Sequence, residues 1–124
     1  MEQVLVIDDD SLMLDVMREI LELGGYSVMT ASSGERGLAL IAEQHPAVVI
    51  TDLIMPHTDG VHVINEIRAH SPDIRIIAIS GTPRIEHLTR AVLAEANRVI
   101  AKPFEQDELL DAVAELMEFP KVTA

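Results

Sequence analysis

Five short apolar runs alternate with five segments of helical periodicity along the chain, and this alternation restricts the fold more than any other feature. The apolar runs predict strands at residues 4–7, 26–31, 47–50, 74–79 and 98–101. Apolar residues that recur at helical spacing predict helices at residues 11–23, 34–44, 60–70, 84–95 and 106–118. Strict alternation of strands and helices is typical of the α/β class, in which a parallel sheet carries helices on both faces.

The residue types in the five runs predict where each strand lies in the sheet. The first, third and fourth runs are almost purely aliphatic, which is expected of central strands that are buried on both faces. The second run contains Ser27 and Thr30, and the short fifth run contains Arg98, so both are expected at the edges. With right-handed crossover connections, the most economical strand order is 2-1-3-4-5, that of a flavodoxin-like (βα)5 doubly wound parallel sheet.

The size, charge and cysteine content of the chain exclude several classes of function. Its 124 residues have the length of one domain, and we expect residues 1–124 to form a single domain with no output domain attached. The formal net charge of −12 disfavours binding to nucleic acid or to a membrane surface and favours a cation or a basic partner. No apolar run approaches the roughly 18 residues of a membrane span, and no signal peptide is expected before the first strand. The absence of cysteine leaves no disulfide framework, so a cytoplasmic protein is expected.

Polar residues directly follow four of the predicted strands. They are three aspartates after the first strand, one after the third, a serine after the fourth and a lysine after the fifth: Asp8, Asp9, Asp10, Asp52, Ser80 and Lys102. The carboxyl ends of parallel strands share one edge of the sheet, and ligands bind there beside the point where the strand order reverses. Neighbouring carboxylates repel one another unless a proton or a cation intervenes, and oxygen ligands suit Mg²⁺ or Mn²⁺. Acids, a hydroxyl and an ammonium around a divalent ion are the components of a phosphoryl-transfer site.

Four motifs carry a resemblance to a known family. They are VLVIDDDSLM at residues 4–13, VVITDLIMPHTDG at 48–60, IIAISGT at 76–82 and VIAKPF at 99–104. In this order and spacing they resemble the receiver domain of two-component response regulators, over essentially the whole chain. The resemblance implies that Asp52 accepts a phosphoryl group from a phosphohistidine of a histidine kinase or a histidine phosphotransfer protein. It also implies a phosphoacceptor that catalyses its own phosphorylation and is not a turnover enzyme.

The resemblance also implies roles for individual residues. The implied ligands of the Mg²⁺ ion are Asp8, Asp9, Asp52 and the backbone carbonyl of Ile54. Ser80 is the implied hydroxyl contact of the phosphoryl group, Lys102 is the implied partner of its oxygens, and the Lys102–Pro103 peptide bond is cis in relatives. Phosphorylation is expected to draw Ser80 toward the phosphoryl group and to shift the face formed by the fourth helix and the fifth strand. Asp10 is explained more simply as the cap of the first helix.

The sequence departs from the family pattern at a residue that takes part in the conformational change. Relatives usually have tyrosine or phenylalanine three residues before the lysine, where Val99 stands in this chain. The conformational change is therefore expected to act through other contacts of the fourth helix and fifth strand. Ile54 and Thr82 flank the phosphoryl pocket in the family pattern, and neither is an acid or amide that could orient an attacking water. Slow self-dephosphorylation is therefore predicted.

Two helices have more apolar residues than one buried stripe requires. Residues 11–23 contain one stripe of Leu12, Val16 and Ile20 and a second of Met13, Met17 and Leu21. Residues 106–118 place Leu109, Val113 and Leu116 inward, with two more apolar residues beside them. Methionines form adaptable contact surfaces, and in the family this side docks the kinase. The predicted partner surface is therefore Met13, Met17, Leu110 and Met117, and the alternative is that these residues thicken the core.

Three other functions fit part of the pattern. A haloacid-dehalogenase-like phosphatase would use Asp8 as nucleophile and Asp10 as its second acid, but its threonine-containing signature is missing and Asp52 would have no role. A flavin-binding electron carrier shares the topology, but it requires a hydroxyl-rich loop after the first strand and aromatic residues that stack on the flavin. A receiver domain used only for assembly is the third alternative, and the complete set of site residues argues against it.

Overall fold

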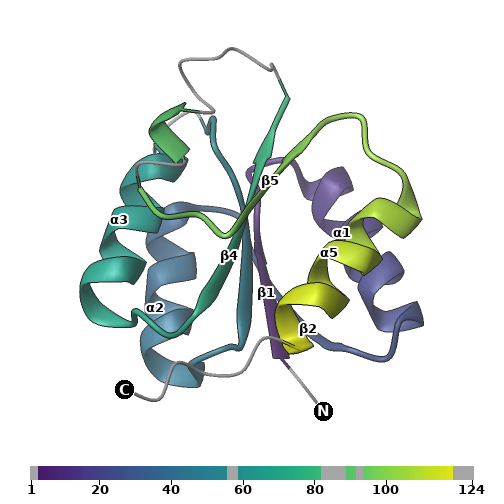
Figure 1. The fold of residues 1–124 in the computed structure, drawn as a ribbon, viewed down its shortest axis with the longest axis horizontal. Helices are drawn as coiled ribbons and strands as arrows, with labels where there is room; N and C mark the ends of the chain where they lie inside the picture. Colours follow the sequence, from purple (N-terminus) through teal and green to yellow (C-terminus); the bar gives the residue numbers. More distant parts are fainter. Residues whose placement is uncertain (1–2, 56–58, 82–88, 92–93, 119–124) are drawn as a thin grey trace.

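The computed structural model describes residues 3–55, 59–81, 89–91 and 94–118 of the chain, and its centre is one sheet (Figure 1). The strands of that sheet are β1 (Gln3–Ile7), β2 (Ser27–Ala31), β3 (Val48–Asp52), β4 (Arg75–Ser80) and β5 (Arg98–Ala101). All pair in parallel, in the order β2-β1-β3-β4-β5. The predicted flavodoxin-like strand order is therefore confirmed, with the two mixed-polarity strands at the edges.

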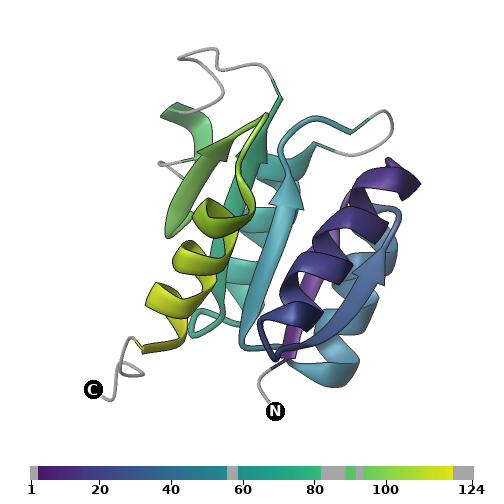
Figure 2. The ribbon, with the colours of Figure 1, turned by 90° about the vertical axis from the view of Figure 1, so that its right-hand side faces the viewer.

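Helices cover both faces of the sheet. They are α1 (Ser11–Leu23), α2 (Gly34–Gln44), α3 (Gly60–His70) and α5 (Gln106–Glu118), each with the predicted bounds. Figures 1 and 2 show α2 and α3 on one face, with α1 and α5 side by side on the other. Of the predicted fourth helix, residues 89–91 are helical, 94 and 95 form a turn, and 84–88 and 92–93 lie outside the described residues. None of the described helices combines the length and hydropathy that a membrane crossing requires.

The core lies on both sides of the sheet because successive strand residues point to opposite faces. Along β1, Leu5 and Ile7 pack toward α2 and α3, whereas Val4 and Val6 pack toward α1 and α5. All of these side chains are fully buried, and each contributes about 1.5–3 kcal/mol through removal of its apolar surface from water. This double burial explains why the central strands read as unbroken aliphatic runs.

The orientation of α1 differs from the prediction. Met17 is buried, with only 1% of its surface exposed, so its assignment to a partner surface is wrong. The exposed apolar residues of α1 include Leu12 at 71% and Val16 at 41%. Adjacent apolar stripes on a helix differ by one residue, a rotation of about 100°, so the sequence does not distinguish between them. Packing of α1 against β2 and α5 selects the stripe that contains Met17 and Leu21.

The predicted inward stripe of α5 is confirmed. Leu109, Val113 and Leu116 are buried against the sheet. Leu110 and Met117 are half-buried and pack against the edge of the same cluster, as Met13 of α1 does. These three residues therefore border the core and still present part of their surface to solvent.

Candidate functional site

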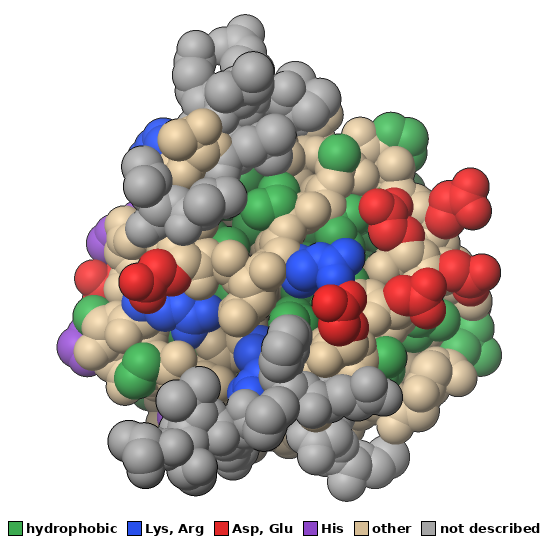
Figure 3. All heavy atoms as spheres, in the orientation of Figure 1, with side chains coloured by type: hydrophobic (Ala, Val, Ile, Leu, Met, Phe, Trp, Pro, Cys, Tyr) green, Lys and Arg blue, Asp and Glu red, His purple; other side chains and the backbone are tan. Residues whose placement is uncertain are grey.

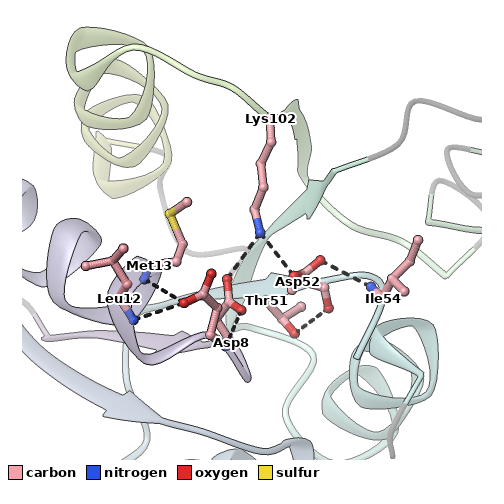
Figure 4. A network of polar contacts seen from close by, with 8 residues as sticks. Asp8, Leu12, Met13, Thr51, Asp52, Ile54 and Lys102 are labelled. Atoms are coloured by element: carbon pink, nitrogen blue, oxygen red, sulfur yellow. Dashed lines mark hydrogen bonds and ion pairs between the residues drawn. The ribbon is translucent and has the colours of Figure 1, made fainter. Parts of the chain in front are cut away.

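Three of the polar residues predicted at the strand ends, Asp8, Asp52 and Lys102, meet at the carboxyl edge of the sheet (Figure 4). Asp52 is the last residue of β3, Asp8 directly follows β1, and Lys102 directly follows β5. The pairing of Ile7 with Thr51 places the ends of β1 and β3 side by side. Lys102 Nζ lies 3.1 Å from Asp52 Oδ2 and 3.4 Å from Asp8 Oδ2. Strand topology therefore brings together groups that are up to 94 residues apart in the chain.

The two carboxylates that contact Lys102 are buried. Asp8 is 1% exposed and Asp52 is 8% exposed, and each accepts a bond from a backbone N–H two residues further on. Burial raises the pKa of Asp8, and the charge of Asp52 raises it further, against the opposing effects of the Asp10 N–H and Lys102. Burial lowers the pKa of Lys102, but the charges of Asp52 and Asp8 outweigh it, so the pKa is raised. The two carboxylates therefore favour the charged form of Lys102, whereas burial disfavours the charged form of Asp8.

The acidic residues can hold a divalent cation. One carboxylate oxygen each from Asp8, Asp9 and Asp52 lies within 4.8 Å of the other two. Oxygens bound to an octahedral Mg²⁺ are separated by roughly 3 to 4 Å, so a small inward movement of the side chains would complete the arrangement. Asp9 is exposed at the rim, which leaves room for water in the remaining positions. An all-oxygen donor set of this kind fits Mg²⁺ or Mn²⁺.

Asp10 does not belong to this group of acids. Its Oδ1 accepts bonds from Leu12 N at 3.0 Å and from Met13 N at 3.4 Å. Asp10 is therefore the N-cap of α1, as predicted. The cap places the start of α1 directly after the acidic pair.

The remaining predicted residues surround the acidic group. Ser80 is fully buried at the end of β4, and its carbonyl accepts a bond from Lys102 N at 2.8 Å. The Lys102–Pro103 peptide bond is cis, as predicted. Ile54 follows Asp52 closely and is half-exposed, Val99 is half-buried against the core on the α2 and α3 side, and Thr82 lies outside the described residues.

Two residues next to Asp52 were not assigned to the site from the sequence. The Thr51 hydroxyl, fully buried, donates to the Asp52 carbonyl at 3.1 Å. Gly60, interpreted from the sequence as an ordinary helix start, packs so closely that an added Cβ would lie 2.1 Å from Asp52 O. Asp59 and Gly60 lie seven and eight residues after Asp52, and this spacing does not by itself indicate that Gly60 packs against Asp52.

Removal of the buried Asp8 charge is expected to stabilise the metal-free protein. Asp8→Asn keeps an oxygen that can accept the hydrogen bond from Asp10 N. It removes a carboxylate whose burial disfavours the charged form. We expect the free energy of unfolding in EDTA to rise by about 1 kcal/mol or more, measured by urea denaturation at neutral pH. Addition of Mg²⁺ should stabilise the unmodified protein and leave the variant nearly unchanged. A variant that Mg²⁺ stabilises equally would remove Asp8 from the ligand set.

The sign of the Asp8 pKa shift also predicts a pH dependence. The pKa of Asp8 in the folded protein lies above the ordinary value of 3.8, so below pH 3.8 the side chain is largely protonated in both the folded and the unfolded protein. As the pH rises through the raised pKa, the buried side chain loses its proton and the folded protein loses stability. The gain in the free energy of unfolding of Asp8→Asn in EDTA should therefore grow as the pH is raised from about 4. A gain that does not change with pH would show that it does not come from the charge of Asp8.

Comparison with known proteins agrees with the geometry. Residues 4–114 match the response regulator receiver domain. The chain belongs to this family. Response regulator MprA of Mycolicibacterium vanbaalenii is 32% identical over 115 residues, which cover 93% of this chain and 50% of that protein. This receiver domain therefore spans about half the length of the curated relatives it matches.

Solved structures show the same fold for this receiver domain. A CheY-like response regulator receiver domain protein from Methanospirillum hungatei aligns with a TM-score of 0.91 and 28% identity over 95% of both chains. A response regulator receiver domain from Clostridium thermocellum aligns with a TM-score of 0.90 and 31% identity over 94% of both chains. These similarities give no support to the haloacid-dehalogenase-like alternative.

Proposed function

We propose that residues 1–124 form one receiver domain that acts in the cytoplasm as a phosphorelay switch. Asp52 accepts a phosphoryl group from a phosphohistidine on a histidine kinase or a histidine phosphotransfer protein. The observation that carries the proposal is the position of the Asp52 carboxylate at a strand end, 3.1 Å from Lys102 Nζ and beside the Asp8–Asp9 pair.

The side chains present can perform the transfer. One Asp52 oxygen forms a bond to phosphorus while the phosphorus–nitrogen bond to the donor imidazole breaks, and the imidazole nitrogen retains the electron pair and takes up a proton. The Ile54 N–H, 3.2 Å from Asp52 Oδ1, orients the carboxylate. Lys102 stabilises the negative charge on the phosphoryl oxygens, and because it is held between two carboxylates it is in place before the donor arrives.

A divalent cation is the proposed cofactor. Asp8, Asp9, Asp52 and the backbone carbonyl of Ile54 would hold Mg²⁺, with Mn²⁺ as a substitute. When bound, the ion neutralises the repulsion between an anionic nucleophile and an anionic phosphoryl group. The burial of Asp8 supports this assignment, because a carboxylate removed from water is stabilised by a nearby cation.

The output of the switch is proposed to start at Ser80. A phosphorylated aspartate carries a charge of about −1.5 to −2, more than the −1 of the free carboxylate, and its phosphoryl oxygens attract hydroxyl donors. Ser80 at the end of β4 is the hydroxyl residue that adjoins Lys102. Movement of Ser80 would shift the chain after β4 and the adjoining β5. Val99 of β5 is smaller than the aromatic residue usual in relatives, so it would not change position in the same way. The domain is then a phosphoacceptor rather than a turnover enzyme.

The kinase-docking surface is proposed on the exposed side of α1. Leu12 and Val16 are exposed there, with Met13 half-buried beside them. Figure 3 shows acidic side chains gathered on the side of the molecule where α5 lies, beside α1. The exposed acids of α5 include Asp107, Glu108, Asp111 and Glu115. Leu110 and Met117 are half-buried on α5 among these acids, so the expected partner is a protein with an apolar patch flanked by basic residues.

Mass spectrometry tests the assignment directly. Incubation with acetyl phosphate and Mg²⁺ should add one phosphoryl group, about 80 Da, which fragmentation or borohydride trapping locates at Asp52. EDTA should prevent the modification, because the repulsion between the anions is then not neutralised. Modification of Asp8 instead, with turnover of p-nitrophenyl phosphate, would favour the phosphatase alternative.

Loss of the phosphoryl group is predicted to be slow. Ile54 is apolar and half-exposed, and Thr82, outside the described residues, has no carboxylate or amide, so neither would orient a water for attack. After removal of the phosphodonor, the decay of the intact-mass signal should follow the chemical lability of an acyl phosphate. Ile54→Glu or Ile54→Gln would introduce a carboxylate or amide that can orient an attacking water. Either variant should shorten the lifetime of the phosphorylated protein. A half-life of seconds in the unmodified protein would contradict the prediction.

A further inference from the structure

One ion pair links the loop after Asp52 to the chain that follows β4. Arg90 Nη2 lies 2.6 Å from Asp59 Oδ2. Asp59 ends the loop that begins at Asp52, whereas Arg90 belongs to the helical residues 89–91, which come after Ser80 in the chain. The contact joins residues 31 apart, and the site as described above does not require it.

The Asp59 end of this pair is held firmly. Asp59 Oδ1 accepts a bond from Val61 N at 2.9 Å and so caps α3. Asp59 also forms an antiparallel bridge with Ile54, the residue whose N–H contacts Asp52. The position of Asp59 is therefore coupled to the loop that carries the phosphoacceptor.

The Arg90 end of the pair lies in a segment whose described core side chains are small. Among the described residues of 89–96, the side chains packed in the core are those of Ala91, Ala94 and Ala96. An alanine side chain removes little apolar surface from water, so these contacts oppose a displacement only weakly. The described segment is also held by the bond from Arg68 Nε to Glu95 O at 3.0 Å, so the ion pair is one of the described contacts that fix the position of residues 89–91.

We propose that Arg90 is a positioning residue that acts through Asp59 and opposes phosphorylation of Asp52. This inference rests on the proposed function, in which a phosphoryl group draws Ser80 inward and displaces the chain after it. Since Asp59 is fixed by its cap and bridge, that displacement lengthens the contact with Arg90. The pair is then intact in the unphosphorylated arrangement and weakened in the phosphorylated one, so it biases the equilibrium toward the former.

The sign of the expected effect separates this role from simple electrostatics. Arg90 is a cation near a site that binds an anion, so its charge alone would favour the phosphoryl group, and its removal would weaken binding. The proposed role predicts the opposite, namely tighter binding after removal. Arg90 and Asp59 are 53% and 43% exposed, so solvent screens the pair and a change of about two- to fivefold is expected.

The test measures the affinity of the protein for beryllium fluoride in saturating Mg²⁺, with calorimetry or NMR as readout. Beryllium fluoride occupies the place of a phosphoryl group on a carboxylate and is not hydrolysed. The variants are Arg90→Gln, Asp59→Asn and the double variant, since asparagine keeps the cap of α3. Arg18→Gln is the matched control because it removes another arginine contact, the bond to Thr30 Oγ1, between α1 and β2 at the edge of the sheet opposite β4 and β5.

We expect Arg90→Gln, Asp59→Asn and the double variant to bind beryllium fluoride about two- to fivefold more tightly, with no added gain in the double variant. Arg18→Gln should match the unmodified protein. Unchanged or weaker binding by Arg90→Gln would overturn the role of Arg90, as would gains that add in the double variant. If the unmodified protein binds no beryllium fluoride, the proposed function itself fails. Circular dichroism of each variant checks that the fold is retained.

Discussion

Asp52→Asn is expected to abolish phosphorylation by acetyl phosphate and Mg²⁺. A carboxamide carries no charge and forms no stable acyl phosphate, so the nucleophile is lost while the shape of the side chain is retained. Removal of a nucleophile elsewhere costs many orders of magnitude in rate, and a fall of roughly a thousandfold or more is expected here. The measurement is the fraction of protein that carries an acid-labile phosphoryl group after a fixed incubation.

The environment of Asp52 explains why no neighbour should replace it. Asp8 is fully buried, and its oxygens are engaged by Asp10 N and Lys102 Nζ. Asp9 is exposed but does not contact Lys102 among the described interactions. Asp111→Asn, the same chemical change on an exposed position of α5, is the matched control and should label normally. Undiminished label on Asp52→Asn would remove Asp52 as the acceptor.

Gly60→Ala is expected to destabilise the domain strongly. The new Cβ would lie 2.1 Å from the carbonyl oxygen of Asp52 and 2.6 Å from Leu53 Cα. Both are backbone atoms at the end of β3, so the clash cannot be relieved by a side-chain rotation. Separation of α3 from β3 would disturb the buried contacts of Val61 and Ile64, and a loss of about 3 kcal/mol is expected in urea denaturation.

A second glycine near the site provides the control for this substitution. At Gly81, an added Cβ would lie 3.8 Å from Lys102 Cδ, an ordinary contact. Gly81→Ala should therefore change the free energy of unfolding by no more than about 0.5 kcal/mol. Gly60→Ala should also impair phosphorylation under conditions in which it is still folded, because relief of the clash moves the Asp52 backbone. A fully stable Gly60→Ala variant would show that α3 does not pack as described.

The strands, most of the helices and the central site could be predicted because their signals are local. Each central strand is aliphatic on both faces, and the helices show apolar residues at helical spacing, so Asp8, Asp52 and Lys102 could be placed at one edge from topology alone. The rotation of α1 could not be predicted because both of its apolar stripes are hydrophobic enough to pack in a core. Only contacts with the sheet and α5 bury Met17 and expose Leu12.

By itself the amino-acid sequence determined the element order, the parallel sheet and the edge at which acids and lysine gather, because hydrophobic periodicity and strand direction are properties of short segments. The tertiary structure alone decided the close approach of Gly60 to Asp52, the burial of Asp8 and the pairing of Asp59 with Arg90. These depend on distances between segments that are remote in the chain. No periodicity encodes such distances, since they arise from the way side chains fill the space between packed elements.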